Sequence, residues 1–355
     1  MTTARWRADA FCRRHGLRAP ILQAPMASAS PPGLAAAVAN AGGMGGMGAL
    51  STSPAGIRDW CADFRGRNNG GFQVNLWIPD PRPVRDAAHE AMVRATLARL
   101  AGVVVPEAGE GPFLPDFEAQ CAAILEAAPA VASSIMGLFP PAVVATLKAR
   151  CIAWFANVTT VAEARAAEAA GADAVVAQGA EAGGHHGSFE DADAEHTLVG
   201  LFALLPQVAD AVGIPVIAAG GIMDGRGVAA ALTLGASAVQ PGTAFLRCPE
   251  AGIGGAWAAA IGQARPEDTV LTRGFSGRLA RGIRNQVTEA FGGALAPAPY
   301  PVQRALMAPV RAAAEAAQDA TLMQAWAGQG AAMARAEPAE ALVRRLWADA
   351  QALLP

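Results

Sequence analysis

Two adjacent histidines stand in a glycine-rich segment, VVAQGAEAGGHHGSF, which spans residues 175–189. Its apolar start is typical of a β-strand, and a glycine pair directly precedes the first histidine. An imidazole changes charge near neutral pH, so it can act as a general acid, a general base or a hydrogen-bond donor. Glycine lets a flat ligand approach the backbone beside it. We therefore predict that His185 is catalytic, that His186 is structural or solvent-facing, and that the ligand is contacted by Gln178, Gly183 and Gly184.

Two further glycine turns each follow an apolar, strand-like run: AAGGI at 218–222 and QPGTAF at 240–245. Glycine exposes backbone N–H groups and a following helix start favours an anion, so two such turns on neighbouring strands can bind one phosphate. Taken singly, each turn is explained equally well as a tight connection without a ligand. The pair favours phosphate binding, by Gly220, Gly221, Gly242 and Thr243.

Two other strand ends carry residues that suit a heterocyclic ring. Asn75 ends the apolar part of FQVNLW with an amide, which either caps the strand or bonds to the ring. Pro25 and Met26 end PILQAPM and offer an apolar surface for a ring face, although Met26 fits a hydrophobic core equally well. Glu181 is either a base or a charge in a turn. No spacing resembles a Ser-His-Asp triad or a metal cluster, so no metal is expected.

The segment GMGGMG at 43–48 matches the glycine pattern of dinucleotide-binding folds. That pattern needs a strand before the glycines and a helix after them. Here a predicted helix at 32–43 comes first and a short strand follows. We therefore interpret this segment as a helix-to-strand turn.

Short apolar runs alternate with alanine-rich helical runs from residue 20 to residue 246. This alternation predicts a parallel sheet with helical crossovers. Eight strand-like runs favour a closed (β/α)8 TIM barrel of the α/β class, with an open doubly wound sheet as the alternative. In a barrel the candidate residues would share the C-terminal face, where active sites form. The predicted strands are 20–26, 46–50, 71–77, 130–137, 151–158, 172–179, 214–222 and 236–246.

The domain prediction places the barrel in residues 1–250. A Pro-rich, polar segment near 79–129 interrupts the rhythm and is expected to be an insertion with one or two helices. Strand-like runs vanish from about Gly252 onward. We therefore predict a smaller, mainly helical subdomain or lid in residues 251–355, whose terminal helices could pack back on the barrel.

Composition limits the function classes. The chain has 355 residues, 53% of them hydrophobic, and a net charge of −3, so it offers no basic surface for nucleic acid. Its five cysteines form no CxxC pair, which predicts a reduced, cytoplasmic protein. The N-terminus lacks the apolar stretch of a signal peptide. Glycine, proline and polar residues interrupt the long uncharged runs, so no membrane span is expected.

Taken together, the motifs resemble the nitronate monooxygenase family, once called 2-nitropropane dioxygenases. The resemblance covers nearly the whole chain in order. It rests on PILQAPMA, AGGMGGMGAL, FQVNLW, AQGAEAGGHHGSF, TLVGLFALLPQV, IPVIAAGGI with DGRG, GASAVQPGTAFL and PYPVQ.

The resemblance implies a TIM barrel that binds FMN, with a smaller domain over the site and His185 as the catalytic histidine. FMN would contact Asn75, Gln178, Gly183, Gly221 and the run Gln240, Pro241, Gly242 and Thr243, with Pro25 and Met26 lining the flavin. Pro241 stands where a larger apolar residue is expected and has no N–H to donate to a phosphate. The family's sites often use several tyrosines, whereas this chain has only Tyr300, the candidate substrate contact.

The implied reaction is oxidation of an alkyl nitronate by O₂ to a carbonyl compound and nitrite. His185 would either stabilise a bound nitronate or take the α-proton of a neutral nitroalkane. One alternative is an NAD(P)H-dependent flavin reductase on the same barrel, acting on quinones or enoyl thioesters. Another is a flavin- or phosphate-binding barrel without catalysis. Homodimerisation stays open.

Overall fold

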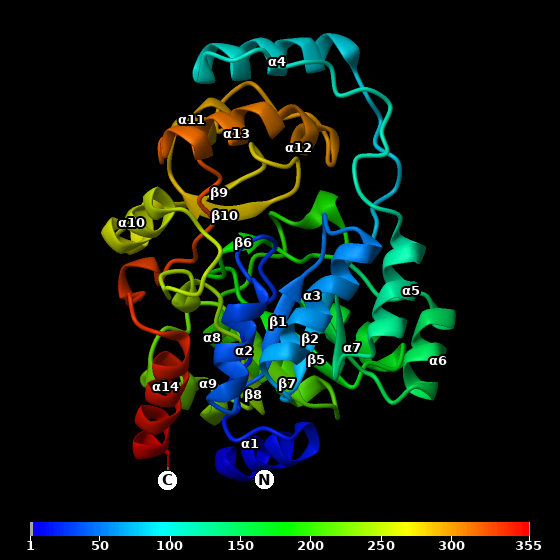
Figure 1. Ribbon diagram of the computed structural model, residues 1–355, viewed down its shortest axis with the longest axis vertical. Helices are drawn as coiled ribbons and strands as arrows, with labels where there is room; N and C mark the ends of the chain where they lie inside the picture. Colours follow the sequence, from blue (N-terminus) through cyan, green and yellow to red (C-terminus); the bar gives the residue numbers. More distant parts are fainter. Residues whose placement is uncertain (1–2, 355) are drawn as a thin grey trace.

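A computed structural model describes residues 3–354 of the chain and contains a parallel barrel (Figure 1). Seven of its strands form one sheet in the order β1-β2-β3-β4-β5-β7-β8, and each pairs in parallel with its neighbours. Helices alternate with these strands, as a parallel sheet requires. The strands are β1 (Gly45–Gly48), β2 (Phe72–Trp77), β3 (Val131–Ile135), β4 (Ala153–Val158), β5 (Ala174–Gln178), β7 (Val216–Ala219) and β8 (Ala238–Val239).

The first predicted strand closes the barrel, although it pairs over only two residues. Ile21 bridges to Val239 of β8, and Leu22 bridges to Met44 just before β1, both in parallel. The backbone N–H of Leu22 donates to the carbonyl of Val239 at 2.8 Å, which joins the two ends of the sheet. The closed barrel is therefore confirmed over the open sheet.

The segment 43–48 leads from a helix into β1, and close packing explains its glycines. A Cβ atom at Gly45 would lie 2.7 Å from the Ala35 side chain, and one at Gly46 would lie 2.5 Å from the carbonyl oxygen of Gln23. The barrel needs glycine here because neighbouring backbone passes too close for a side chain.

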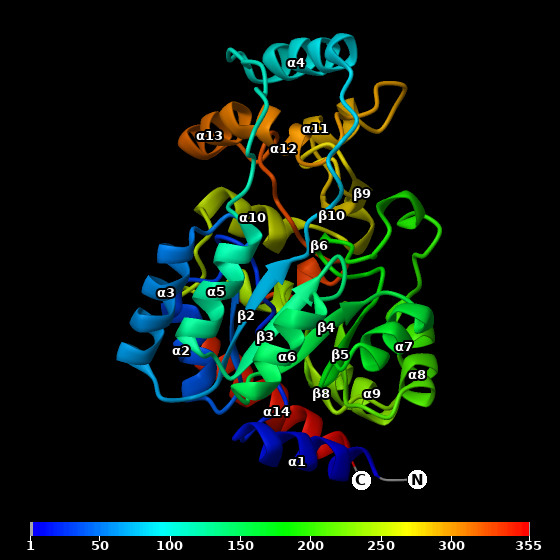
Figure 2. The same ribbon diagram turned by 90° about the vertical axis from the view of Figure 1, so that its right-hand side faces the viewer.

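Several of the outer helices begin at side-chain caps. Ser53, Thr160 and Asp224 accept backbone N–H groups at the starts of three of them, α3, α7 and α9. The C-terminal helix packs against α9 and α2 on the barrel (Figures 1 and 2). The helices around the barrel are α1 (Ala4–His15), α2 (Pro32–Asn40), α3 (Pro54–Arg67), α5 (Phe117–Ala127), α6 (Pro141–Ala149), α7 (Val161–Ala169), α8 (Leu201–Ala211), α9 (Gly225–Thr233) and α14 (Ala339–Leu353).

A second region, formed by residues 79–114 and 255–326, lies over the strand ends at the top of Figures 1 and 2, and we call it the covering region. It has its own buried cluster, which includes Leu97, Phe275, Val302 and Val310. The insertion contributes α4 (Ala87–Ala101), which contacts α11 and α13, whereas α5 packs beside α3 on the barrel. Its other helices are α10 (Gly255–Gln263), α11 (Gln286–Ala290), α12 (Val302–Leu306) and α13 (Ala308–Ala317).

The covering region also contains strands, which the sequence did not indicate after residue 252. β9 (Thr269–Thr272) and β10 (Ala280–Ile283) pair in antiparallel register, and β10 also pairs with the two-residue strand β6 (Gly184–His185). β10 reads ARGI, with a charge and a glycine in four residues, so it has no apolar run to reveal it. This small sheet brings the histidine loop under the covering region.

Within residues 3–354, no helix is both long and apolar enough to cross a bilayer. The five cysteines are all free, and the described residues hold no cluster of three or more metal-ligating acidic, histidine or cysteine side chains.

Candidate active site

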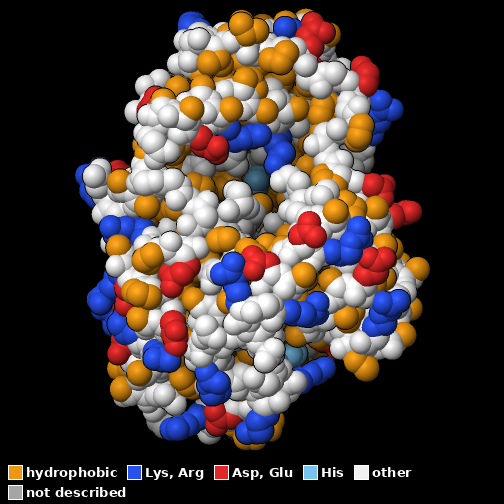
Figure 3. Space-filling view, viewed as in Figure 1, with side chains coloured by type: hydrophobic (Ala, Val, Ile, Leu, Met, Phe, Trp, Pro, Cys, Tyr) orange, Lys and Arg blue, Asp and Glu red, His pale blue; other side chains and the backbone are white. Residues whose placement is uncertain are grey.

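A cavity of about 360 Å³ lies between the C-terminal ends of the barrel strands and the covering region. Figure 3 shows a hollow beneath the covering helices, with a histidine inside it and basic side chains along its upper rim. This size is within the range of small-molecule sites. Its wall includes all the predicted cofactor contacts and the catalytic candidate: Pro25, Met26, Asn75, Gln178, Gly183, Gly184, His185, Gly220, Gly221, Gln240, Pro241, Gly242 and Thr243.

The two glycine turns line the cavity next to each other because β7 and β8 are neighbours in the barrel. Gly220 and Gly221 have φ of 116° and 66°, which only glycine adopts readily. Within the described chain, the backbone N–H groups of Gly221, Gly242 and Thr243 have no protein acceptor. These unpaired donors at a cavity wall suit an anionic group of a ligand.

Two amides on the barrel wall are held by neighbouring side chains. Asn75 donates through Nδ2 to Ser133 Oγ at 3.1 Å, and the Oε1 of Gln240 accepts from Gln73 Nε2 at 2.9 Å. Each amide keeps further hydrogen-bonding capacity for a ligand. Pro25 and Met26 form an apolar part of the same wall, as predicted for a ring face.

Gln178 shapes the histidine loop as well as lining the cavity. Its Nε2 donates to the carbonyl of His185 at 2.9 Å, and its Oε1 accepts the N–H of Gly187 at 2.7 Å. Asn157 donates to the same Oε1 at 3.2 Å. The side chain therefore fixes this loop, a role that the sequence analysis did not anticipate, and the second proton of its Nε2 stays available to a ligand.

The glycine pair before His185 has two separate structural causes. A Cβ atom at Gly183 would lie 2.4 Å from the backbone nitrogen of Gly328, because the chain crosses there on its way back to the barrel. Gly184 has φ of 75° and open space around it. Close approach of the protein's own backbone thus explains Gly183, whereas Gly184 serves the turn that directs His185 into the cavity.

His185 is the histidine of the pair that lines the cavity. Its Nε2 lies 2.8 Å from Ser276 Oγ, and its ring makes edge contacts with Trp77 and Trp326. Burial, reinforced by the positive charges of Arg278 and Arg304, lowers the pKa of His185 to about 3. The imidazole is therefore neutral at physiological pH.

His186 points away from the cavity, but it is not solvent-facing. It is 5% exposed, and its backbone N–H donates to the carbonyl of Leu279 at 2.9 Å. Burial lowers the pKa of His186 to about 4. Its place in the protein interior is consistent with the structural half of the prediction and differs from the solvent-facing half.

Tyr300, the predicted substrate contact, does not belong to the cavity wall in the described structure. Its ring stacks on Trp77 at 5.1 Å with an interplanar angle of 9°, and burial raises the pKa of its hydroxyl. The tyrosine therefore supports Trp77 by stacking, and Trp77 itself lines the cavity.

The covering wall contains residues that the sequence analysis missed: Trp257, Arg304, Arg311, Glu315 and Trp326. Their signal in the sequence is weak because α12 and α13 read as ordinary alanine-rich helices with single charges. Ser276 was also missed, because only the tertiary fold brings it to His185. PYPVQ was the one nearby motif that the resemblance used.

Arg304 and Arg311 form a basic rim, with Glu315 on the same wall. Arg311 donates through Nη1 to the carbonyl of Arg304 at 3.1 Å, and neither guanidinium has a carboxylate within ion-pair distance among the described residues. Burial lowers the pKa of Arg304. Burial together with the Arg304 charge, partly offset by the Glu315 carboxylate, lowers the pKa of Arg311 to about 10. Both arginines are partly buried, and partly buried charges without an ion-pair partner are costly, so this wall favours an anionic ligand.

A TIM barrel with glycine turns that carry unpaired backbone donors, side-chain amides and a neutral histidine under a cover is the arrangement of a cofactor-dependent barrel enzyme. The chain matches the nitronate monooxygenase family over residues 10–349. This match covers nearly all of its length, so the chain belongs to that family, which is flavin-dependent, and the resemblance read from its motifs is confirmed.

Comparison with individual relatives agrees with this family assignment. The chain is 41% identical over 345 residues to a nitronate monooxygenase of Pseudomonas aeruginosa, covering 95% of this chain and 98% of the relative. It superposes with a TM-score of 0.89 on a nitroalkane oxidase from Streptomyces ansochromogenes, at 41% identity and covering 95% and 96% of the two chains. FabK from Thermotoga maritima has a TM-score of 0.75 at 27% identity, covering 97% and 96%.

Proposed function

We propose that this chain oxidises alkyl nitronates with O₂, yielding a carbonyl compound and nitrite, and that its flavin is FMN. The observation that carries this proposal is the single cavity wall that combines unpaired backbone donors with a neutral His185. FMN ends in one phosphate, which matches the donors of Gly221, Gly242 and Thr243. Asn75, Gln178 and Gln240 would hold the polar edge of its ring, and Pro25 with Met26 would lie against a ring face.

FMN would supply the electron chemistry, and the protein contributes position and hydrogen bonds. His185 contributes a neutral imidazole whose tautomer depends on Ser276. The Ser276 hydroxyl accepts the N–H of Arg278 at 3.2 Å and can donate its own proton either to the Arg278 carbonyl at 3.2 Å or to His185 Nε2.

The two settings of that hydroxyl give His185 two different functions. If the hydroxyl donates to Nε2, the imidazole carries its proton on Nδ1 and can donate it to a bound nitronate oxygen. If the hydroxyl donates to the Arg278 carbonyl, Nε2 carries the proton and Nδ1 has a free lone pair for the α-proton of a nitroalkane. Both need an uncharged ring, which the low pKa of His185 favours.

The basic rim narrows the substrate class. Arg304 and Arg311 belong to the same cavity as His185 but to the opposite, covering wall. A nitronate with a second anionic group, such as a carboxylate, can place that group at the arginines while its reacting end meets the barrel wall. We infer that such nitronates are preferred over simple alkyl nitronates.

Three inferences accompany this function. Separate buried clusters support a division into a barrel and the covering region, with 79–114 and 255–326 forming the latter. Free cysteines accord with the reduced environment of the cytoplasm. Homodimerisation is a further expectation, which sedimentation of the flavin-loaded protein would test.

The test begins with the purified protein and its absorbance spectrum. Denaturation should release a flavin that co-elutes with FMN, and anaerobic nitronate should bleach the bound flavin. Release of FAD, or of no flavin from folded protein, would contradict the cofactor assignment. Bleaching by NADPH but not by nitronate would favour a reductase, and a flavin-loaded protein without nitronate turnover would favour a non-catalytic barrel.

A further inference from the structure

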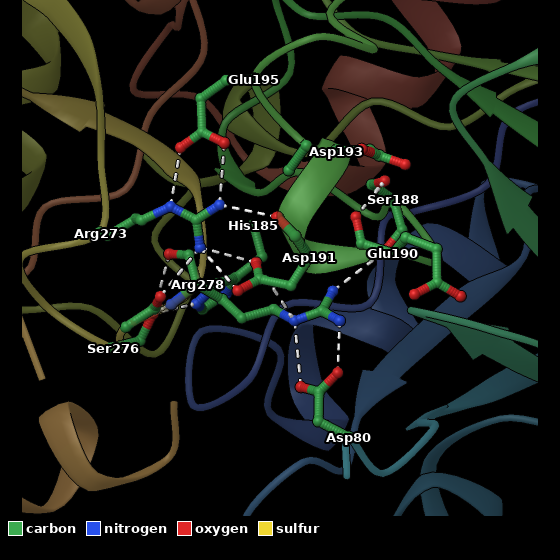
Figure 4. A network of polar contacts seen from close by, with 12 residues as sticks. Asp80, His185, Ser188, Glu190, Asp191, Asp193, Glu195, Arg273, Ser276 and Arg278 are labelled. Carbon is green, nitrogen blue, oxygen red and sulfur yellow. Dashed lines mark hydrogen bonds and ion pairs between the residues drawn. The ribbon is translucent and has the colours of Figure 1, made fainter. Parts of the chain in front are cut away.

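Arg278 lies at the centre of a polar network behind His185 (Figure 4). It is 1% exposed, which is unusual for an arginine and requires that its charge be matched. Its Nε donates to Asp80 Oδ2 at 3.0 Å, and its Nη2 donates to the other oxygen of the same carboxylate. This fork-to-fork pair is the strongest geometry available to the two side chains.

The guanidinium joins segments that meet around the histidine. Asp80 begins the insertion after β2, and Nη1 of Arg278 also donates to the carbonyl of Ser188 at 3.0 Å, three residues after His185. The guanidinium carbon lies 5.9 Å from the centre of the Trp77 ring, which itself contacts His185. One side chain therefore fixes the loops on both sides of the imidazole.

The backbone of Arg278 reaches His185 directly through one hydroxyl. Its N–H and its carbonyl both lie 3.2 Å from Ser276 Oγ, which is the hydrogen-bond partner of the imidazole. Two residues further on, Ala280 of β10 pairs with His185 of β6. A shift of Arg278 would therefore move both the hydroxyl that sets the tautomer and the strand that holds the ring.

We propose that Arg278, anchored by Asp80, is a positioning residue that fixes Ser276 and thereby the orientation and tautomer of His185. This inference rests on the proposed role of His185 in nitronate oxidation. It predicts that Arg278 affects the chemical step and not the retention of flavin or substrate. Lysine cannot replace it, because an ammonium keeps the charge but cannot bind Asp80 in a fork and reach Ser188 as well.

The experiment compares Arg278→Lys with a second variant, Arg278→Met combined with Asp80→Asn, which removes both charges and leaves no buried carboxylate unpaired. The control is Arg345→Met with Glu337→Gln, which removes a partly buried ion pair between α14 and the residues just before it. At matched flavin content, both test variants should lower kcat for nitronate by about tenfold or more, with KM changed less than about threefold. The control should stay within about twofold.

A double-mutant cycle with His185→Asn separates positioning from general damage. Once His185 is absent, Arg278→Lys should change the remaining turnover less than about twofold, because coupled residues are not additive. An equal loss with and without His185, or loss of flavin in both test variants, would overturn the inference and leave the proposed function intact. Unchanged turnover in His185→Asn alone would overturn both.

Discussion

The two walls of the cavity present different chemical groups. The barrel wall presents glycine backbone and side-chain amides at strand ends, whereas the covering wall presents arginines and tryptophans from segment 257–326. Groups at strand ends are fixed by the sheet, so they suit a ligand that never changes, such as a cofactor. Long charged side chains on a separate layer suit selection among substrates. The difference indicates that cofactor retention and substrate choice are separable in this protein.

The strongest test of this division compares the two adjacent histidines. His185→Asn should keep FMN bound and lower nitronate turnover by roughly a hundredfold or more, the usual scale for a positioned acid–base or charge-stabilising group. His186→Asn should cost far less turnover, because His186 lies outside the cavity wall. Steady-state oxidation at matched flavin content measures both. Greater damage from His186→Asn would reverse the assignment.

Substitution of Arg304 and Arg311 tests whether the covering wall selects substrates. Arg304→Gln and Arg311→Gln should each raise KM for a carboxylate-bearing nitronate by about tenfold, the order of one charge-assisted hydrogen bond. The same variants should change KM for an uncharged alkyl nitronate little. Arg58→Gln is the control, since Arg58 pairs with Glu126 at the barrel surface. Equal losses on both substrates would show that the arginines serve flavin binding or folding instead.

The difference between the barrel wall and the covering wall also explains which site residues could be predicted from the sequence. Gly221, Gly242 and His185 stand at or a few residues beyond the ends of strand-like runs, so barrel geometry alone assigns them to one face. Ser276 and Arg304 reach the cavity only through packing of the covering region, and no local pattern marks that packing. Pairing between β6 and β10 joins residues almost a hundred positions apart, with too few apolar residues to predict either strand.

Gln178→Ala tests the barrel wall where the cofactor and the histidine loop meet. Loss of one hydrogen bond to the ring should weaken FMN retention about fivefold. Turnover at full flavin loading should also fall, because Gln178 holds both His185 and Gly187. Gln207→Ala is the control, since that amide bonds only within α8. Equilibrium dialysis measures FMN affinity and steady-state assays measure turnover. If Gln178→Ala lowers neither, Gln178 does not belong to the site.

The protonation state of His185 predicts a flat pH dependence. Its pKa is lowered by burial to about 3, so the ring stays neutral from pH 5 to pH 8 and kcat/KM should show no inflection from it. The unfolded chain protonates this histidine near pH 6.5, so below that pH the unfolded state binds more protons and the free energy of unfolding decreases. Thermal unfolding at pH 5 and pH 7 measures the second effect. An inflection near pH 6.5 that disappears in His185→Asn would contradict the neutral imidazole.

The smallest expected effect is that of Tyr300→Phe. The hydroxyl is buried without a hydrogen-bond partner in the described structure, and the ring stacks on Trp77 without lining the cavity itself. Phenylalanine keeps the stacking and removes an unsatisfied polar group, which is neutral or slightly stabilising. We expect nitronate kcat and KM to stay within about twofold and the melting temperature to be unchanged or slightly higher. Trp77→Leu should change nitronate kcat and KM more than Tyr300→Phe does, because it removes an aromatic part of the cavity wall and the edge contact to His185. A marked rise in KM for Tyr300→Phe would place the hydroxyl at the substrate and would mean that the cavity wall extends behind Trp77 when substrate binds.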